Sequence, residues 1–142
     1  MKFLLAIDGS KFSEAAIQSV IAHHKLQGLE ARVFHAIELP TSLMAPEITL
    51  YVPPMESVEE AKALVAKAAS ALRSAGVNVT TSVVQGDAKS AILDDAKKWS
   101  ADLIVLGSRG RKGMERFMLG SVSEAVLRHA HCSVEIVRPP VK

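Results

Sequence analysis

Three glycines and the polar residues beside them are the part of this chain best suited to chemistry. Gly107-Ser-Arg-Gly110 is followed, after nine intervening residues, by Gly120-Ser121. An apolar run over 101–106 leads into the first glycine, and a helical pattern starts at Gly120. Glycine lets backbone N–H groups approach an anion closely, and a helix N-terminus adds unpaired donors and a favourable dipole. The spacing therefore predicts a site for the phosphate groups of a ligand.

Positive charge gathers between these glycines. Basic side chains stand at Arg109, Arg111, Lys112 and Arg116. They favour the attraction of phosphate, and a solvated charged loop is the alternative interpretation for the last three. The chain contains neither G-x-x-x-x-G-K-S/T nor G-x-G-x-x-G. It therefore lacks the signatures of P-loop NTPases and of dinucleotide-binding Rossmann domains.

Composition limits the class of protein. The 142 residues are 49% hydrophobic and 4% aromatic, which suits one domain with a core of Ala, Val, Ile and Leu. A formal net charge of +2 argues against a nucleic-acid partner or a membrane surface. No apolar run approaches the ~18 residues of a membrane-spanning helix, and Met1-Lys2 leads into an apolar run instead of a cleavable signal. We therefore expect a soluble, cytoplasmic protein.

Short apolar runs alternate with helical patterns along the chain. The apolar runs lie at 3–7, 31–37, 77–84, 101–106 and 133–137, with helical patterns at 12–23, 58–72, 86–99 and 120–130. This alternation predicts a parallel α/β sheet with right-handed crossovers. Ligands of such sheets bind beyond the carboxyl ends of the strands, where Asp8 and Gly107 are expected to lie. The proline-containing segment 38–56 either folds over a ligand or serves as a spacer.

The G-x2-G-x9-G-S pattern from Gly107 to Ser121 resembles the ATP-binding signature of the universal stress protein family. Asp8-Gly-Ser10, His35-Ala36 and the C-terminal run from His131 to Arg138 resemble the family as well. The resemblance covers essentially the whole chain as one domain, 1–142, and is weak over 39–56. It implies a five-stranded parallel sheet of order 3-2-1-4-5 with helices on both faces, a Rossmann-like fold of the adenine nucleotide alpha hydrolase type.

The resemblance also implies a set of nucleotide contacts and ATP as the cofactor, with or without magnesium. The positions that it assigns to the nucleotide are Ala6, Ile7, Asp8, Ala36, Leu106, Gly107, Arg109, Gly110, Gly120, Ser121 and Val122. Ala6 and Ile7 would line the base, and the backbone of Ala36, where the family often has Val, would meet adenine. Arg109 replaces a frequent His. Asp8 would accept hydrogen bonds from the ribose or the adenine side.

Two of these residues also have purely structural interpretations. Asp8 before Gly9 can form a turn by bonding its own backbone. Ser121-Val-Ser-Glu124 matches a capping box, in which the Ser side chain caps the helix and the Glu side chain returns to the Ser N–H. A capping role for Ser121 and a phosphate-binding role do not exclude each other.

Two classes of function fit these features, and a third fits less well. The first is an ATP-binding regulatory or stress-survival protein that forms a homodimer through its last strand, Ser133–Val137, as the resemblance implies. The alternative is a slow ATPase or another nucleotide-using enzyme, for which no catalytic base beyond Asp8 can be named. A phosphoacceptor receiver domain would need an acidic cluster that Asp8-Gly-Ser does not supply.

No residue of the chain is assigned a catalytic or metal-binding role. The single cysteine, Cys132, excludes an internal disulfide and is expected to be a small buried thiol. His35 lies within a predicted strand, so we expect a buried hydrogen-bonding residue there and not a catalytic base.

Overall fold

The structure, a computed structural model, describes residues 1–25, 27–38, 56–110 and 119–139. Its strands are β1 (Lys2–Ala6), β2 (Glu30–Ile37), β3 (Asn78–Gln85), β4 (Leu103–Gly107) and β5 (Ser133–Val137). Its helices are α1 (Lys11–His23), α2 (Val58–Ser74), α3 (Ala88–Trp99) and α4 (Ser121–His129). The segment 38–56, apart from its two end residues, lies outside the described residues, as do Arg111, Lys112 and Arg116.

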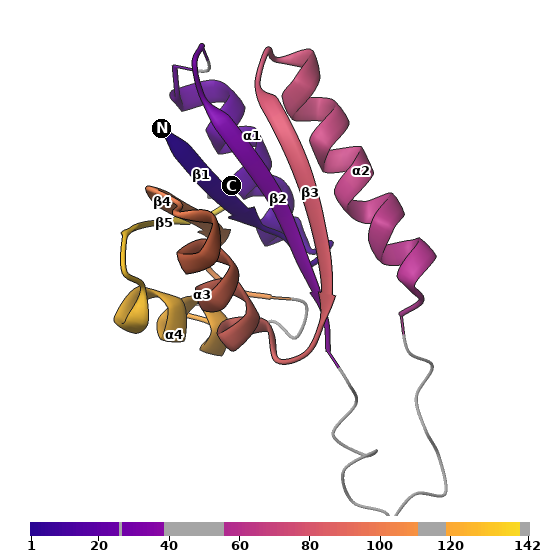
Figure 1. The fold of residues 1–142 in the computed structure, drawn as a ribbon, viewed down its shortest axis with the longest axis vertical. Coiled ribbons are helices and arrows are strands. Elements are labelled where there is room, and N and C mark those ends of the chain that lie inside the picture. Colours follow the sequence, from indigo (N-terminus) through magenta and orange to yellow (C-terminus); the bar gives the residue numbers. More distant parts are fainter. Residues whose placement is uncertain (26, 39–55, 111–118, 140–142) are drawn as a thin grey trace, which may run out of the picture.

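The strands form one parallel sheet in the order β3-β2-β1-β4-β5 (Figure 1). Helices α1 and α2 cover one face of the sheet, and α3 and α4 cover the other. The predicted fold class is therefore confirmed, including the strand order and the helices on both faces. The order reverses between β1 and β4, which is where such folds bind their ligands.

Each face of the sheet carries its own apolar cluster. Leu4 and Leu5 are neighbours in β1 and both are fully buried, but Leu5 belongs to the α1/α2 cluster and Leu4 to the α3/α4 cluster. Successive side chains of a strand point to opposite faces, so a strand covered by helices on both faces must be apolar at every position. This requirement explains the continuous apolar runs of β1 and β4.

The two strands at the edges of the sheet are more exposed. β3 has only one buried residue, Val79, and β5 has none. The alternation of polar and apolar residues over 77–84 therefore marked an edge strand correctly.

Most of the described helices start at a side-chain cap. Ser10, Ser57 and Asp87 each accept a hydrogen bond from the backbone N–H three residues later, at the starts of α1, α2 and α3. Such caps satisfy one of the free donors of the first turn. α4 differs, because its N-cap is Gly120 and no side chain caps it. Among the described residues, no helix is long and apolar enough to cross a membrane.

Gly107 lies where β4 meets the first turn of α1, and alanine should destabilise the fold there. A Cβ at this position would lie 2.7 Å from backbone atoms of Phe12, so the helix would have to move. We expect Gly107→Ala to lower the free energy of unfolding by about 1–3 kcal/mol in urea denaturation. Gly76→Ala is the control for backbone strain alone, since its φ is +96° but its Cβ would meet nothing within 4 Å. If Gly107→Ala lowered the free energy of unfolding no more than Gly76→Ala does, the close packing of Gly107 against Phe12 would be contradicted.

Cys132 precedes β5 and is half-buried beside the α3/α4 cluster. Burial raises the pKa of its thiol above the ordinary value, and the Asp102 carboxylate raises it further. The thiolate is the reactive form, so a raised pKa lowers the reactive fraction at pH 8. We expect iodoacetamide to alkylate the native protein more slowly than the urea-unfolded protein, with the native rate increasing as the pH rises above 8. Intact-mass spectrometry measures both rates, and equal rates would show an unperturbed, accessible thiol.

Candidate functional site

The carboxyl ends of three neighbouring strands frame the candidate site. Ala6 at the end of β1 pairs in register with Leu106 of β4 on one side and with Phe34 of β2 on the other. Gly107 directly follows Leu106, and Ala36 lies two residues beyond Phe34. Ala6, Ala36 and Leu106 all contribute to the α3/α4 cluster, so their side chains lie on one face of the sheet. The sheet thus brings the candidate residues of β1, β2 and β4 to one edge.

Asp8 organises the turn between β1 and α1. Its Oδ1 accepts hydrogen bonds from the Ser10 N–H (2.9 Å) and the Ser13 hydroxyl (2.7 Å). The Asp8 N–H in turn donates to the Ser13 Oγ at 2.8 Å, and Gly9 adopts a φ of +82°. The turn-forming interpretation of Asp8 is therefore confirmed. The same carboxylate also faces the second candidate glycine, because a Cβ at Gly110 would lie 2.9 Å from Oδ2.

Gly120 brings the start of α4 against the loop that follows β4. A Cβ at Gly120 would lie 3.2 Å from the Arg109 Cα and 3.6 Å from both the Gly110 nitrogen and the Ser108 oxygen. The Gly120 N–H donates to that Ser108 carbonyl at 2.8 Å. Two segments that are far apart in the motif therefore touch through their backbones, and a side chain at position 120 would separate them.

The predicted capping box at the start of α4 is wrong. The N-cap is Gly120, whose carbonyl accepts the Glu124 N–H at 2.9 Å, and Ser121 is already the first helical residue. The Glu124 side chain pairs with Arg128 at 2.9 Å and does not return to the helix start. Close backbone contact at Gly120 makes the chain enter the helix one residue earlier than a Ser121 cap would require. In the described part of the chain, no side-chain cap satisfies the first N–H groups of α4.

Two serines of the site were not assigned a role from the sequence. Ser123 is buried, and its hydroxyl donates to the Gly107 carbonyl at 2.6 Å, which ties the first turn of α4 to the end of β4. Ser108 is 3% exposed, and among the described residues its Oγ has no hydrogen-bond partner. The Ser108 N–H donates to the Val137 carbonyl at 2.9 Å, and the Ser108 carbonyl accepts the Gly120 N–H at 2.8 Å. A buried hydroxyl without a partner is costly, and this one lies within the glycine motif.

Arg109 brings a positive charge to the site. Its guanidinium lies 4.9 Å from the centre of the Phe12 ring, a cation–π contact with the first turn of α1. This contact places the cation between the β1–α1 turn and the loop after β4. The other basic residues of the motif, Arg111, Lys112 and Arg116, lie outside the described residues.

The end of β2 holds a buried histidine. His35 is 3% exposed, and its ring nitrogens contact the Ile7 carbonyl and the Glu56 carboxylate, each at 2.7 Å. The expectation of a buried hydrogen-bonding residue is confirmed. The side chain of Ile7 packs with the α1/α2 cluster, so it lies on the opposite face of the sheet from Ala6 and Ala36.

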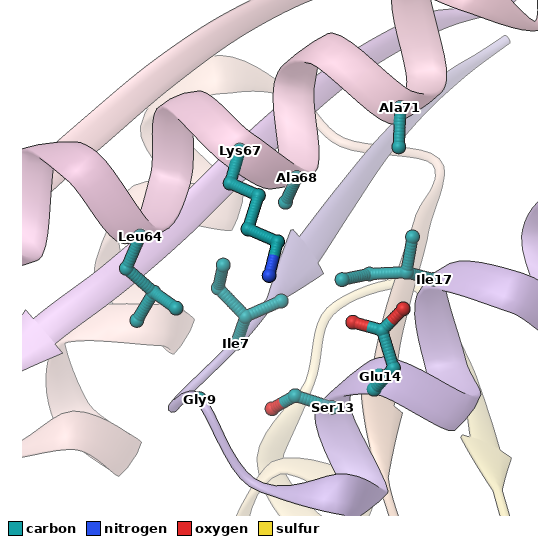
Figure 2. A pocket seen from close by; sticks show the side chains of 9 residues that line it. All are labelled: Ile7, Gly9, Ser13, Glu14, Ile17, Leu64, Lys67, Ala68 and Ala71. Atoms are coloured by element: carbon teal, nitrogen blue, oxygen red, sulfur yellow. The ribbon is translucent and has the colours of Figure 1, made fainter.

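A cavity of about 140 Å³ lies on the α1/α2 face, where Ile7, Gly9 and Ser13 bring it next to the turn after β1 (Figure 2). Its walls are mainly apolar, with Lys67 of α2 and Glu14 of α1 directed towards it. Of the candidate nucleotide residues only Ile7 reaches it. In the described part of the chain, no three His, Cys, Asp or Glu residues are grouped so that they could hold a metal ion.

Solved structures share this fold. The structure of hypothetical protein MJ0577 superposes with a TM-score of 0.82 at 26% identity, over 99% of this chain and 97% of that one. The Archaeoglobus fulgidus universal stress protein in complex with dAMP gives a TM-score of 0.69 at 23% identity, over 96% and 97% of the two chains. An Arabidopsis thaliana protein of the universal stress protein family with AMP bound gives a TM-score of 0.66 at 16% identity, over 99% of this chain and 93% of that one.

Sequence comparison gives the family. Universal stress protein MJ0531 of Methanocaldococcus jannaschii is 31% identical over 142 residues, covering 99% of this chain and 84% of the relative. YxiE of Bacillus subtilis is 34% identical over 148 residues, covering 96% and 98%. The sequence profile of the universal stress protein family matches residues 1–138. The chain therefore belongs to the universal stress protein family.

Proposed function

We propose that this protein binds ATP at the carboxyl edge between β1 and β4 and works as a nucleotide-dependent regulatory protein. The observation that carries the proposal is the start of α4. It is the one described helix without a side-chain cap, and its glycine cap lies against the loop of Arg109 and Gly110. A helix N-terminus with free N–H groups, approached by glycine backbone, is suited to phosphate.

The phosphate end of the proposed site combines three kinds of donor. The N–H groups of Ser121 and Val122 belong to the uncapped first turn of α4. The buried Ser108 hydroxyl, which has no partner in the described part of the chain, offers a further donor. Arg109 adds a positive charge held near the turn of β1 by its contact with Phe12. Charge-assisted hydrogen bonds from such donors to phosphate are stronger than bonds between neutral groups.

The base end of the proposed site lies at the ends of β1 and β2. In a strand, the N–H and C=O of one residue point to the same neighbouring strand, and those of the residue two positions later point there as well. The Phe34 carbonyl accepts the Ile7 N–H on the side of β1. The N–H and C=O of Ala36 therefore also face the side of β1. β1 pairs with β2 only as far as Ala6 opposite Phe34, so Ala36 lies beyond the last pair. One donor beside one acceptor matches the ring nitrogen and amino group of adenine. Ala6 and Leu106 would supply apolar contact.

The bound relatives support an adenine nucleotide. Solved structures with this fold include proteins in complex with dAMP and with AMP. ATP is proposed here because the phosphate end extends from the loop after β4 to the start of α4 and carries several donors. Any Mg²⁺ would come with the phosphates, since Mg²⁺ in such sites keeps several waters and takes phosphate oxygens as ligands.

We also propose that the protein forms a homodimer through β5. Val137 faces β4, because its carbonyl accepts the Ser108 N–H, so the backbone groups of Val134 and Ile136 face the open edge. A partly exposed apolar edge strand tends to be paired or covered. Antiparallel pairing of β5 with its own copy across a two-fold axis would satisfy these groups.

Gly120→Val tests the nucleotide site. A branched side chain would lie in the space between the start of α4 and the Arg109 Cα, now 3.2 Å from where a Cβ would be. It would displace the N–H groups proposed to bind phosphate. Losing two or three hydrogen bonds to a charged ligand, at ~1.5–3 kcal/mol each, should weaken ATP binding at least about a hundredfold. Isothermal titration calorimetry measures the change, and unchanged affinity would rule out this site.

Asp87→Ala is the matched control for stability. It removes the side-chain cap of α3 and should cost about 1 kcal/mol of folding free energy without changing the affinity for ATP. The same titrations can be followed by phosphate release. A turnover above roughly 1 s⁻¹, at the low end of ordinary enzyme rates, would replace the regulatory proposal with an enzymatic one.

Ile136→Pro tests the dimer. Proline removes the N–H that faces the open edge of β5 and adds strain there, so self-association should weaken at least about tenfold. Thr81→Pro is the control, since Thr81 lies on the opposite edge strand β3 with its N–H facing outward as well. Sedimentation equilibrium at micromolar concentration measures both variants. A monomeric wild-type protein, or equal effects of the two prolines, would contradict dimerisation through β5.

A further inference from the structure

The hydrogen-bond ladder between β1 and β2 stops at an unusual point. Its last rung joins the Ile7 N–H to the Phe34 carbonyl at 2.9 Å. In a regular parallel ladder, the Ile7 carbonyl would then accept the N–H of Ala36. It accepts the ring Nδ1 of His35 instead, at 2.7 Å. The ring of His35 thus lies at the acceptor that the Ala36 N–H would otherwise use, and among the described residues Ala36 makes no backbone bond to this carbonyl.

The contacts of the ring fix its proton and its orientation. A carbonyl oxygen only accepts, so the Nδ1 of His35 carries a hydrogen and donates it to Ile7. The Nε2 lies 2.7 Å from the Glu56 carboxylate, which directly precedes the N-cap of α2. The ring is 3% exposed and held at both nitrogens. It therefore cannot turn away from Ile7 without breaking a second buried contact.

We propose that His35 is a positioning residue for the base: by taking the Ile7 carbonyl, it keeps the Ala36 N–H unpaired and available to adenine. The inference rests on the proposed function, because it assumes a nucleotide at this edge. His35 itself lies on the α1/α2 face, beside Ile7, and does not contact the ligand. Its effect is to end the ladder one rung early. Ala36 is only partly buried, which is compatible with a ligand at its backbone.

His35→Gln and His35→Asn separate this role from general stability. The amide nitrogen of Asn can take the place of Nδ1 and keep a donor for Ile7, whereas that of Gln takes the place of Nε2 and reaches Glu56 only. In the Gln variant the Ala36 N–H is then expected to close onto the Ile7 carbonyl. We expect AMP binding to weaken at least about tenfold in His35→Gln, the worth of one hydrogen bond, and to change less than about threefold in His35→Asn.

Two further readouts distinguish positioning from a structural role. Inorganic tripolyphosphate, which has no base, should bind both variants as it binds the wild type. Hydrogen exchange of the Ala36 amide, followed by NMR, should slow at least about tenfold in His35→Gln, because that N–H gains an acceptor. His35→Val, which offers no donor at all, should behave like His35→Gln and provides a second test if the Gln variant does not fold.

The outcomes separate this inference from the proposed function. Wild-type protein that binds neither ATP nor tripolyphosphate would overturn the proposed function, and the role of His35 with it. Wild-type protein that binds AMP, with the Gln and Val variants binding it equally well, would overturn the role of His35 alone. An Ala36 amide that exchanges at the same rate in all folded variants would do the same.

Discussion

The close approach of the loop after β4 to the turn after β1 is the constraint on which the rest of the structure depends. A Cβ at Gly107 would meet the backbone of Phe12, and one at Gly110 would meet the Asp8 carboxylate. At Gly120 a Cβ would come closest to the Cα of Arg109. At the first two positions a Cβ would fall within 3 Å of existing atoms. Gly107 is therefore required by the packing of the chain on itself, before any ligand is considered, because the atoms that it meets belong to the backbone. At Gly110 the close atom is the end of the Asp8 side chain, and at Gly120 the Arg109 backbone would have to shift by a few tenths of an ångström. The same packing sets the start of α4 against the β1 edge.

The packing gives a single residue, Asp8, a structural role beside the ligand role that is proposed for it. One carboxylate oxygen holds the turn through Ser10 and Ser13, and the other faces Gly110. A change of this side chain would alter the turn, the loop and any ligand contact at once. The uncapped start of α4 differs from the starts of the other described helices, each of which has one first-turn N–H satisfied by a side-chain cap. Its first donors are the ones that we propose for the phosphate groups.

The sequence predicted the strands, their order and the glycine motif because these depend on local pattern and on a family resemblance. It missed features that depend on distance in space. The contact of His35 with Glu56 spans 21 residues of sequence, and the bond from Ser123 to the Gly107 carbonyl spans 16. The capping box failed for a similar reason, because the cap at Gly120 is decided by its contact with Arg109 and not by the residues that follow it.

The proposed base end of the site illustrates how a side chain on one face of a sheet can affect the backbone groups at the edge of that sheet. Ile7 packs with the α1/α2 helices, whereas Ala6 and Ala36 contribute to the α3/α4 cluster. The Ile7 carbonyl, directly after β1, can accept a hydrogen bond either from the His35 ring on the α1/α2 face or from the backbone N–H of Ala36. The His35 ring on one face donates to that carbonyl, and among the described residues the Ala36 amide makes no backbone bond to it. Recognition of a base there would then depend on a residue that never touches it.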